Sequence, residues 1–182
     1  KPLEIAIGDV DTTYLAVDLS AELGHKYIQI PPLNLSTAFN SPYSYASYLV
    51  MNYLYISLKL LVERVYPAGL PEESELSRRL EAIQPEIEEL RIKKEVDYKK
   101  ANELKVPLFK IIWQDFKRNH LDRDTDLAKD FTAYVKKNKD LMDRLPYLVL
   151  RDVYFPDDAQ VFKDDIAHQP MVNGWDWRIW PV

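Results

Sequence analysis

Three carboxylates spaced two residues apart form the first pattern in this sequence that could bind an ion. Asp122, Asp124 and Asp126 copy the opening of a calcium-binding loop, in which alternating oxygens surround the metal. Leu127 stands where that loop needs glycine for its turn, and Ala133 stands where it needs a bidentate carboxylate. We therefore interpret the three aspartates as a helix cap or a solvated turn.

Histidine and glycine patterns give no metal-binding or nucleotide-binding motif. His25, His120 and His168 are far apart and lack the HxxxH and HExxH spacings that place two ligands on one helix face. The chain has no cysteine, which excludes thiolate metal sites, and its four glycines form no phosphate-binding loop. We predict no metal ion and no cofactor.

The charge balance of the chain bears on whether it can bind nucleic acid. The chain carries 29 acidic and 24 basic residues, a formal net charge of -5, which leaves no excess positive charge to hold a phosphate backbone. Nucleic acid is therefore not expected as a partner. The many carboxylates could supply an acid and a nucleophile for glycoside chemistry, but geometry and not composition defines such a pair.

The elements that must position these side chains are mainly helical. Four glycines against twelve prolines, with long charged segments of helical periodicity, favour a mainly α protein with few tight turns. Residues 14–23 are expected to form a short helix that ends at Gly24. Residues 26–31 are expected to form a short strand, since Pro31 and Pro32 cannot donate to a strand ladder and would end it.

Three further amphipathic stretches predict helices. The first, over residues 70–83, opens with a proline and two acids at the positive end of the helix dipole. The second runs in helical register from 101 to 112, with a kink or a helix start at Pro107. The third covers 127–145 and is expected to be interrupted by Pro146.

Residues 43–62 are apolar and rich in tyrosine, so they must be tested as a membrane span. Lys59 is their only charged residue. Five tyrosines, three serines and one asparagine nevertheless make the stretch too polar for the centre of a bilayer. We do not expect a membrane span and interpret the segment as buried core with a ligand-facing loop.

Several short motifs occur in an order and at spacings that resemble one enzyme family. They are Ile7-Gly8-Asp9, the segments 24–33, 40–48 and 54–58, Val96-Asp97-Tyr98 with 105–108 and Phe116, 141–143 with 147–150, and the terminal segment 177–181. Together they are similar to the N-terminal region of the amylomaltases, the 4-α-glucanotransferases of glycoside hydrolase family 77. That family has GxGD, a helix, GxxYWQxLPL, DSPYxSxSxFAxNP, VDY and WxxWP. The motifs cover most of the chain, and the resemblance depends on their order.

The resemblance implies a fold and a mechanism. The family fold is a (β/α)8 barrel with helical insertions, and its catalysis uses an aspartate nucleophile, a glutamate acid/base and a third aspartate, all beyond the WxxWP segment. A closed barrel needs eight strands and typically about 250 residues. We therefore expect a remnant of the N-terminal part of a (β/α)8 barrel plus the helical insertion, mainly α with one or two short strands and no closed barrel.

A chain of 182 residues, 47% of them hydrophobic, can bury one core. We expect a single domain over residues 1–182. Residues 1–66 would form a portion derived from the barrel, with a helix, a strand and a loop. Residues 67–151 would form the helical insertion, and residues 152–182 an irregular C-terminal segment.

The resemblance also indicates which residues would face a glucan. They are Phe39, Ser41, Pro42, Tyr43 and Tyr45, in or beside the SPY loop. Phe39 replaces a family tyrosine, so it could stack on a sugar but has no hydroxyl. Ile28 replaces a family tryptophan, and Arg144 and Pro146 replace a tyrosine and a leucine. Such changes are expected where sugar binding no longer matters.

Three functions fit these observations. The first is a non-catalytic protein that binds other protein subunits in a larger assembly, because a missing barrel would leave apolar faces uncovered. The second is the N-terminal part of a 4-α-glucanotransferase, acting on α-1,4-glucans by double displacement through a covalent glycosyl-enzyme. The third is a glucan-binding module that uses Phe39, Tyr43 and Tyr45 as stacking platforms. We predict the first function, with no catalytic residue. The expected partners are protein subunits of a larger assembly and, in addition, α-glucan.

The start of the chain leaves its compartment open. It begins at Lys1 without an initiator methionine or an apolar presequence, which fits a processed mature protein or a fragment of a longer one. A chain without cysteine is compatible with an organelle, such as a mitochondrion or plastid, and with the cytoplasm.

Overall fold

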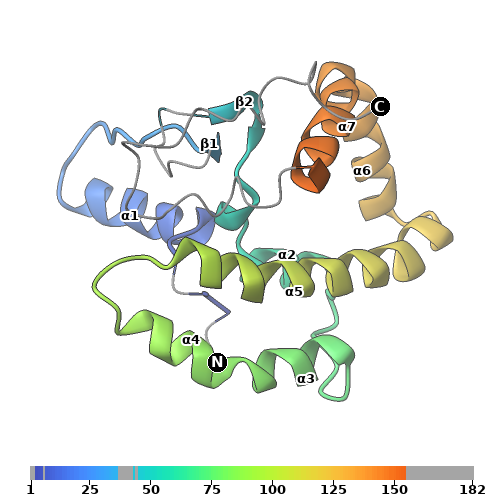
Figure 1. Ribbon diagram of the computed structural model, residues 1–182, viewed down its shortest axis with the longest axis horizontal. Coiled ribbons are helices and arrows are strands. Elements are labelled where there is room, and N and C mark those ends of the chain that lie inside the picture. The colour runs from blue at the N-terminus through green and yellow to red at the C-terminus, as the bar shows by residue number, and fades with distance from the viewer. Residues whose placement is uncertain (1–2, 6, 37–42, 44, 155–182) are drawn as a thin grey trace. The chain divides into compact units, whose positions relative to one another are not determined.

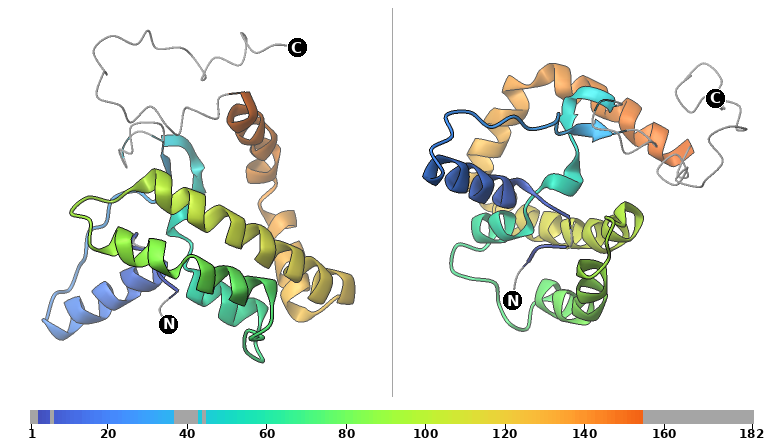
Figure 2. Two further views of the ribbon diagram at one scale, coloured as in Figure 1. Left: turned by 60° about the horizontal axis from the view of Figure 1, so that its bottom comes forward. Right: turned by 90° about the vertical axis from the view of Figure 1, so that its left-hand side faces the viewer.

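The computed structural model describes residues 3–5, 7–36, 43 and 45–154, whose helices and strands are shown in Figures 1 and 2. The chain divides into two compact units. Unit 1 consists of Lys1–Ile30 and Asn52–Asp130, and unit 2 of Pro31–Met51 and Phe131–Val182. The single domain in three parts stays a prediction.

Helix α1 of unit 1 spans Val10–Glu22 and is closed at its end by glycine, as expected. Gly24 has φ +80°, a left-handed conformation that glycine adopts without steric cost. Its N–H donates to the carbonyl of Ala21 at 2.9 Å, and the N–H of His25 donates to the carbonyl of Ser20 at 2.9 Å. The strand predicted over residues 26–31 is wrong, because this segment has no strand pairing and the sheet uses later residues.

The remaining helices of unit 1 begin at residues that can cap them. Helix α2 (Leu58–Val65) begins after Ser57, α3 (Glu75–Ala82) after Ser74 and α5 (Tyr98–Asn119) after Asp97, and each of these side chains accepts a hydrogen bond from a first-turn N–H. Helix α4 (Gln84–Arg91) has proline in its first turn instead. The predicted helix over 70–83 therefore starts later than expected, at the serine cap.

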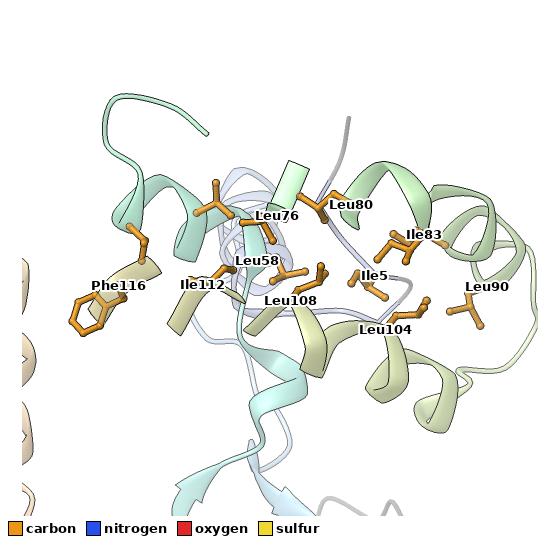
Figure 3. Packing of buried hydrophobic residues seen from close by; sticks show 13 residues of the cluster. Ile5, Leu58, Leu76, Leu80, Ile83, Leu90, Leu104, Leu108, Ile112 and Phe116 are labelled. Carbon is orange, nitrogen blue, oxygen red and sulfur yellow. The ribbon is translucent and has the colours of Figure 1, made fainter. Parts of the chain in front are cut away.

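The core of unit 1 is formed by one face each of α2, α3, α4 and α5, together with Ile5. Figure 3 shows these side chains meeting between the helices. The buried members are Ile5, Leu58, Val62, Val65, Leu76, Leu80, Ile83, Ile87, Leu90, Leu104, Leu108, Ile112 and Phe116. A smaller cluster of Ile7, Leu54 and Ala101 is formed by the N-terminal segment, the 3-10 turn η1 (Tyr53–Tyr55) and α5.

Proline lies inside two helices without ending them. Pro107 lies within α5 and does not mark its beginning. Leu104 and Leu108, on either side of it, are both buried, so core packing offsets the hydrogen bond that proline removes. Pro146 lies within α7 (Lys139–Tyr154), so the prediction that it interrupts the helix is wrong.

The third predicted stretch is instead divided at Asn138. Helix α6 spans Asp126–Lys137, and α7 begins directly afterwards. The side-chain amide of Asn138 donates to the carbonyl of Tyr134 at 2.8 Å. A local bond of this kind competes with the helical hydrogen-bond pattern, which is why asparagine favours helix ends.

The sheet belongs to unit 2 and has two antiparallel strands, β1 (Asn34–Ser36) and β2 (Tyr45–Met51). The register shifts twice along the pair. Within the residues that the structure describes, the fold is mainly helical with one two-stranded open sheet and no closed barrel. The predicted fold class, a mainly α remnant of a barrel-type fold with one or two short strands, is confirmed.

Candidate functional site

Helix α1 is stabilised at its start by Asp9. The Asp9 carboxylate accepts hydrogen bonds from the N–H groups of Asp11 at 2.9 Å and Thr12 at 3.2 Å. The Thr13 hydroxyl donates to the carbonyl of Asp9 at 3.1 Å. Asp9 is itself buried, so the residue that caps the helix lies within unit 1, and its side chain satisfies first-turn N–H groups.

Beyond this first turn, α1 makes almost no contact with the rest of unit 1. None of its residues is buried, and the left panel of Figure 2 shows the helix running outward. The helix and the segment after it carry eight large apolar side chains that are 40% to 92% exposed. We call this set the α1 surface: Tyr14, Leu15, Val17, Leu19, Leu23, Tyr27, Ile28 and Ile30. Exposed apolar area gathered on one segment is typical of a contact surface.

The charges on α1 are distributed unevenly. At its start, Asp11 forms an ion pair with Lys59 of α2, with 3.0 Å between the Lys59 Nζ and a carboxylate oxygen. The hydrogen bond to Asp11 raises the pKa of Lys59. Toward its end, Asp18 and Glu22 have no ion pair within the described part of the chain, and the last turn carries no basic residue. The end of the helix is therefore acidic, and no described cation is paired with it.

A buried lysine lies where α5 meets η1. The Lys105 side chain is 1% exposed, and its Nζ donates to the carbonyl of Leu54 at 2.5 Å. The Phe109 ring lies 5.8 Å from the ammonium group. Burial lowers the pKa of Lys105 to about 8, although the charges of Asp9 and Glu4 act in the opposite direction.

Asn102 holds the same turn from α5. The Tyr53 hydroxyl donates to the Asn102 side-chain oxygen at 2.8 Å, and the Asn52 side chain accepts from the Leu54 N–H at 3.0 Å. Together with Lys105, these contacts fix η1 on α5. Lys105 was not predicted as a functional residue, although a charged residue four positions after Ala101 on an apolar helix face is a signal that could have indicated it.

A second polar cluster joins α2 and α5. The Tyr66 hydroxyl donates to the Asp115 carboxylate at 2.5 Å, and Arg118 pairs with the other carboxylate oxygen. Burial is the larger cause that raises the pKa of Tyr66, and the hydrogen bond to Asp115 is the next.

An open hollow of about 460 Å³ adjoins this cluster. It is lined by Ser74, Glu75, Lys110, Ile111, Gln114, Asp115 and Arg118. Its two cations and two carboxylates select no single ligand class.

The predicted glucan-facing residues belong to unit 2. Phe39, Ser41 and Pro42 lie outside the described residues. Tyr43 lies in a turn and is 75% exposed, and Tyr45 is the first residue of β2, where it pairs with Ser36. Tyr48, in the same strand, is 64% exposed. It was not predicted, although its place in the tyrosine-rich stretch could have indicated it.

The structure locates some of the histidines and aspartates that were considered as metal ligands. His120 contacts the Thr125 hydroxyl at 3.0 Å and the carbonyl of Val65 at 2.9 Å, so it joins helices within unit 1. Asp124, in the aspartate run, has a left-handed φ of 50° in the turn before α6. No metal-holding group of histidine and carboxylate side chains occurs among the described residues. His25 is exposed, and His168 lies outside the described residues.

No helix in the described ranges is long and apolar enough to cross a membrane. The stretch tested for this, residues 43–62, instead contributes β2, η1 and part of α2. It mixes buried side chains such as Leu54 and Leu58 with the exposed Tyr43 and Tyr48. Leu54 and Leu58 confirm the buried-core part of the interpretation, whereas the ligand-facing loop stays a prediction.

Comparisons with known proteins identify the family. Neither the curated proteins nor the solved structures give a match. A family model described as 4-alpha-glucanotransferase matches residues 2–178, which is nearly the whole chain. The chain therefore belongs to the 4-alpha-glucanotransferase family, glycoside hydrolase family 77.

Proposed function

We propose that this chain is a non-catalytic member of its family that acts as a structural subunit and contacts protein through the α1 surface. One observation carries the proposal. A capped helix of 13 residues has no buried side chain and, with the segment that follows, exposes eight large apolar ones. Burying a fully exposed leucine or isoleucine side chain yields about 1.5–3 kcal/mol, so a protein surface that covers these side chains would gain free energy from their burial.

Three carboxylates with structural partners support the non-catalytic part of the proposal. Retaining glycoside chemistry needs two carboxylates about 5–5.5 Å apart and free to act as nucleophile and acid. Asp9 caps α1, Asp97 caps α5 and pairs with Lys93, and Asp115 is bound to Tyr66 and Arg118. Each of these groups has a structural role already.

Catalysis is tested by incubating the purified chain with maltotriose and separating the products. No longer or shorter maltooligosaccharide is expected. A second assay adds the chain to a family 4-α-glucanotransferase from which the segment matching residues 2–178 has been deleted. Transfer by the chain alone, or restored transfer in the mixture, would overturn the proposal and favour a part of a working enzyme.

Contact through the α1 surface is tested with the dye ANS, which binds accessible apolar surface. In dilute solution the wild-type chain should enhance ANS fluorescence, and the triple variant Leu15→Ser, Leu19→Ser, Leu23→Ser should lose most of this signal. Circular dichroism should show both chains folded, because none of the three leucines is buried. A triple variant that is unfolded, or that binds ANS like the wild type, would contradict the proposal.

A second candidate function is binding of α-glucan by the tyrosines of unit 2. The exposure of Tyr43 and Tyr48 in and beside β2 favours it, since exposed aromatic rings offer apolar faces with a hydroxyl at one end. Titration with maltoheptaose should then change tyrosine fluorescence saturably, and Tyr48→Ala should weaken the response. Tyr134→Ala, at an exposed tyrosine of α6, is the matched control. The absence of any saturable change would exclude this function.

A further inference from the structure

The buried amine of Lys105 holds a turn of the backbone but has few partners of its own. Its Nζ donates to the carbonyl of Leu54 at 2.5 Å and lies 5.8 Å from the centre of the Phe109 ring. An ammonium group has three N–H donors. Within the described residues, Lys105 has one hydrogen-bond acceptor and forms no ion pair. Its charged form is therefore poorly compensated, whereas an uncharged amine can still donate to the carbonyl.

The turn that Lys105 holds, η1, is attached to unit 1 by few apolar contacts. Leu54 is its only buried residue. It packs with Ile7 and Ala101 in the smaller cluster, which is separate from the main core. Elements with few buried apolar contacts open at a lower free energy than the core does. We therefore expect η1 to open locally while the main core stays folded.

The titratable groups around this amine show which of them responds to pH. Burial lowers the pKa of Lys105 to about 8, against the opposing charges of Asp9 and Glu4. Carboxylates keep their charge between pH 7 and 9, and phenols and ordinary amines titrate near pH 10. The other titratable groups on the elements that pack here are Tyr55 of η1, Tyr98 of α5 and Lys59 of α2. Lys105 is the member of this set that changes charge between pH 7 and 9.

We propose that Lys105 and η1 form a pH-dependent switch, in which the uncharged amine keeps the turn closed on α5 and the charged ammonium favours a locally open turn. In the open turn the amine reaches water, so the open form binds the proton more tightly than the closed form. The open fraction is therefore largest well below pH 8 and falls as the pH rises through 8 toward 10.5. Raising the pH from 7 to 9 should lower it about tenfold.

The switch acts on the end of strand β2. That strand ends at Met51, and the next residue, Asn52, caps η1. Opening of the turn therefore frees the end of the strand that carries the exposed Tyr48. The switch concerns the conformation of this segment and does not depend on the proposed contact through the α1 surface.

Hydrogen exchange of the amides in and beside η1 tests the switch. The N–H groups of Leu54, Tyr55 and Ile56 donate to acceptors within the turn at 3.0, 3.0 and 3.1 Å, so they are protected while the turn is closed. Their protection, corrected for the intrinsic exchange rate at each pH, should rise about tenfold from pH 7 to pH 9 in the wild-type chain.

Three variants assign this pH dependence to the amine. Lys105→Met keeps an apolar stem without an amine, and the protection of its η1 amides should be the same at pH 7 and pH 9. Lys110→Met, at an exposed lysine of the same helix, is the matched control and should behave as the wild type does. Asn102→Ala removes the acceptor of the Tyr53 hydroxyl, so it should increase opening about fivefold at both pH values and leave the pH dependence unchanged.

Several outcomes would overturn the switch. If the η1 amides are as protected as the amide of the buried Ile112 at both pH values, the turn opens only when the whole unit unfolds. Protection that does not change with pH, or that changes equally in Lys105→Met, would also refute it. If that variant does not fold, a nitrogen NMR titration of the wild-type Lys105 amine decides. Titration near pH 8 supports the switch, and titration above pH 10 refutes it. None of these failures affects the proposed function.

Discussion

Helices α1 and α5 belong to the same unit and are stabilised in different ways. Helix α5 buries six residues along its 22, five of which are apolar or aromatic, and contacts α2, α3 and η1. Helix α1 buries none of its 13 residues and is held at its ends, by Asp9 at the start and by the glycine turn at residue 24. Packing stabilises α5, whereas capping stabilises α1. A helix of the second kind offers its sides to a partner.

Truncating one leucine in each helix tests this difference most directly. Leu108 is fully buried in the core of α5, so Leu108→Ala should lower the free energy of unfolding by about 3–5 kcal/mol. Leu19→Ala on α1, measured in dilute solution, should change it by less than about 0.5 kcal/mol. Urea unfolding followed by circular dichroism measures both. Equal losses would mean that α1 is part of the core.

The buried amine of α5 predicts an unusual dependence on pH. The pKa of Lys105 is lowered from 10.5 to about 8 in the folded chain, so the folded chain releases this proton first as the pH rises. Between pH 8 and 10.5 the unfolded chain binds more protons, and the free energy of unfolding should rise by up to about 3 kcal/mol from this group.

Lys105→Met removes this contribution while keeping an apolar stem of similar length. The wild type should gain stability relative to this variant between pH 8 and 10.5, as measured by urea unfolding at each pH. Lys59→Met is the control. The pKa of Lys59 is raised by Asp11, so its contribution is present at neutral pH and is lost at high pH. Parallel curves for the wild type and Lys105→Met would contradict the prediction.

The link between α2 and α5 should have an intermediate effect. Tyr66→Phe removes the hydroxyl that donates to Asp115, and a hydrogen bond to a charged, partly buried group contributes about 1.5 kcal/mol. Arg118→Gln, on the same carboxylate but 72% exposed, should cost no more than about 0.5 kcal/mol. Thermal unfolding of the two variants separates them. A larger loss for Arg118→Gln would show that the ion pair, and not the hydroxyl, joins the helices.

The sequence predicted the features that depend on local patterns. Helical periodicity located α1, α5 and α6, and Gly24 located the end of α1, because a left-handed residue after a helix is a local requirement. The wrong prediction at Pro146 and the continuation of α5 through Pro107 share one cause. The cost of proline within a helix is known from sequence, but the packing that offsets it, as at Leu104 and Leu108, depends on residues far away in the chain.

The strand error has a similar origin. Residues 26–31 have the composition of a strand, but a strand forms only where a partner can pair with it, and β1 pairs with β2 instead. The candidate sites show the same limit. Exposed tyrosines could be expected from the SPY resemblance, whereas nothing local distinguishes an exposed Leu19 from a buried Leu108. Exposure is decided by what the rest of the chain covers.

The smallest expected effect tests the end of α1. Gly24 has φ +80° and no atom within 4 Å of the position of an added Cβ, so Gly24→Ala is strained only by its backbone, at a cost of about 1 kcal/mol. Because α1 buries nothing, this cost should appear as fraying of the last turn and not as a loss of global stability. Hydrogen exchange of the Leu23, Gly24 and His25 amides should then accelerate about fivefold.

Gly8→Ala is the matched control for this measurement. Gly8 also has open space around its added Cβ, but its φ is not positive, so its substitution should leave exchange at the end of α1 unchanged. If Gly24→Ala instead lowers the midpoint of global unfolding while the last turn exchanges as before, the end of α1 is coupled to the core. Capping would then not be what holds this helix, and the contrast with α5 would fail.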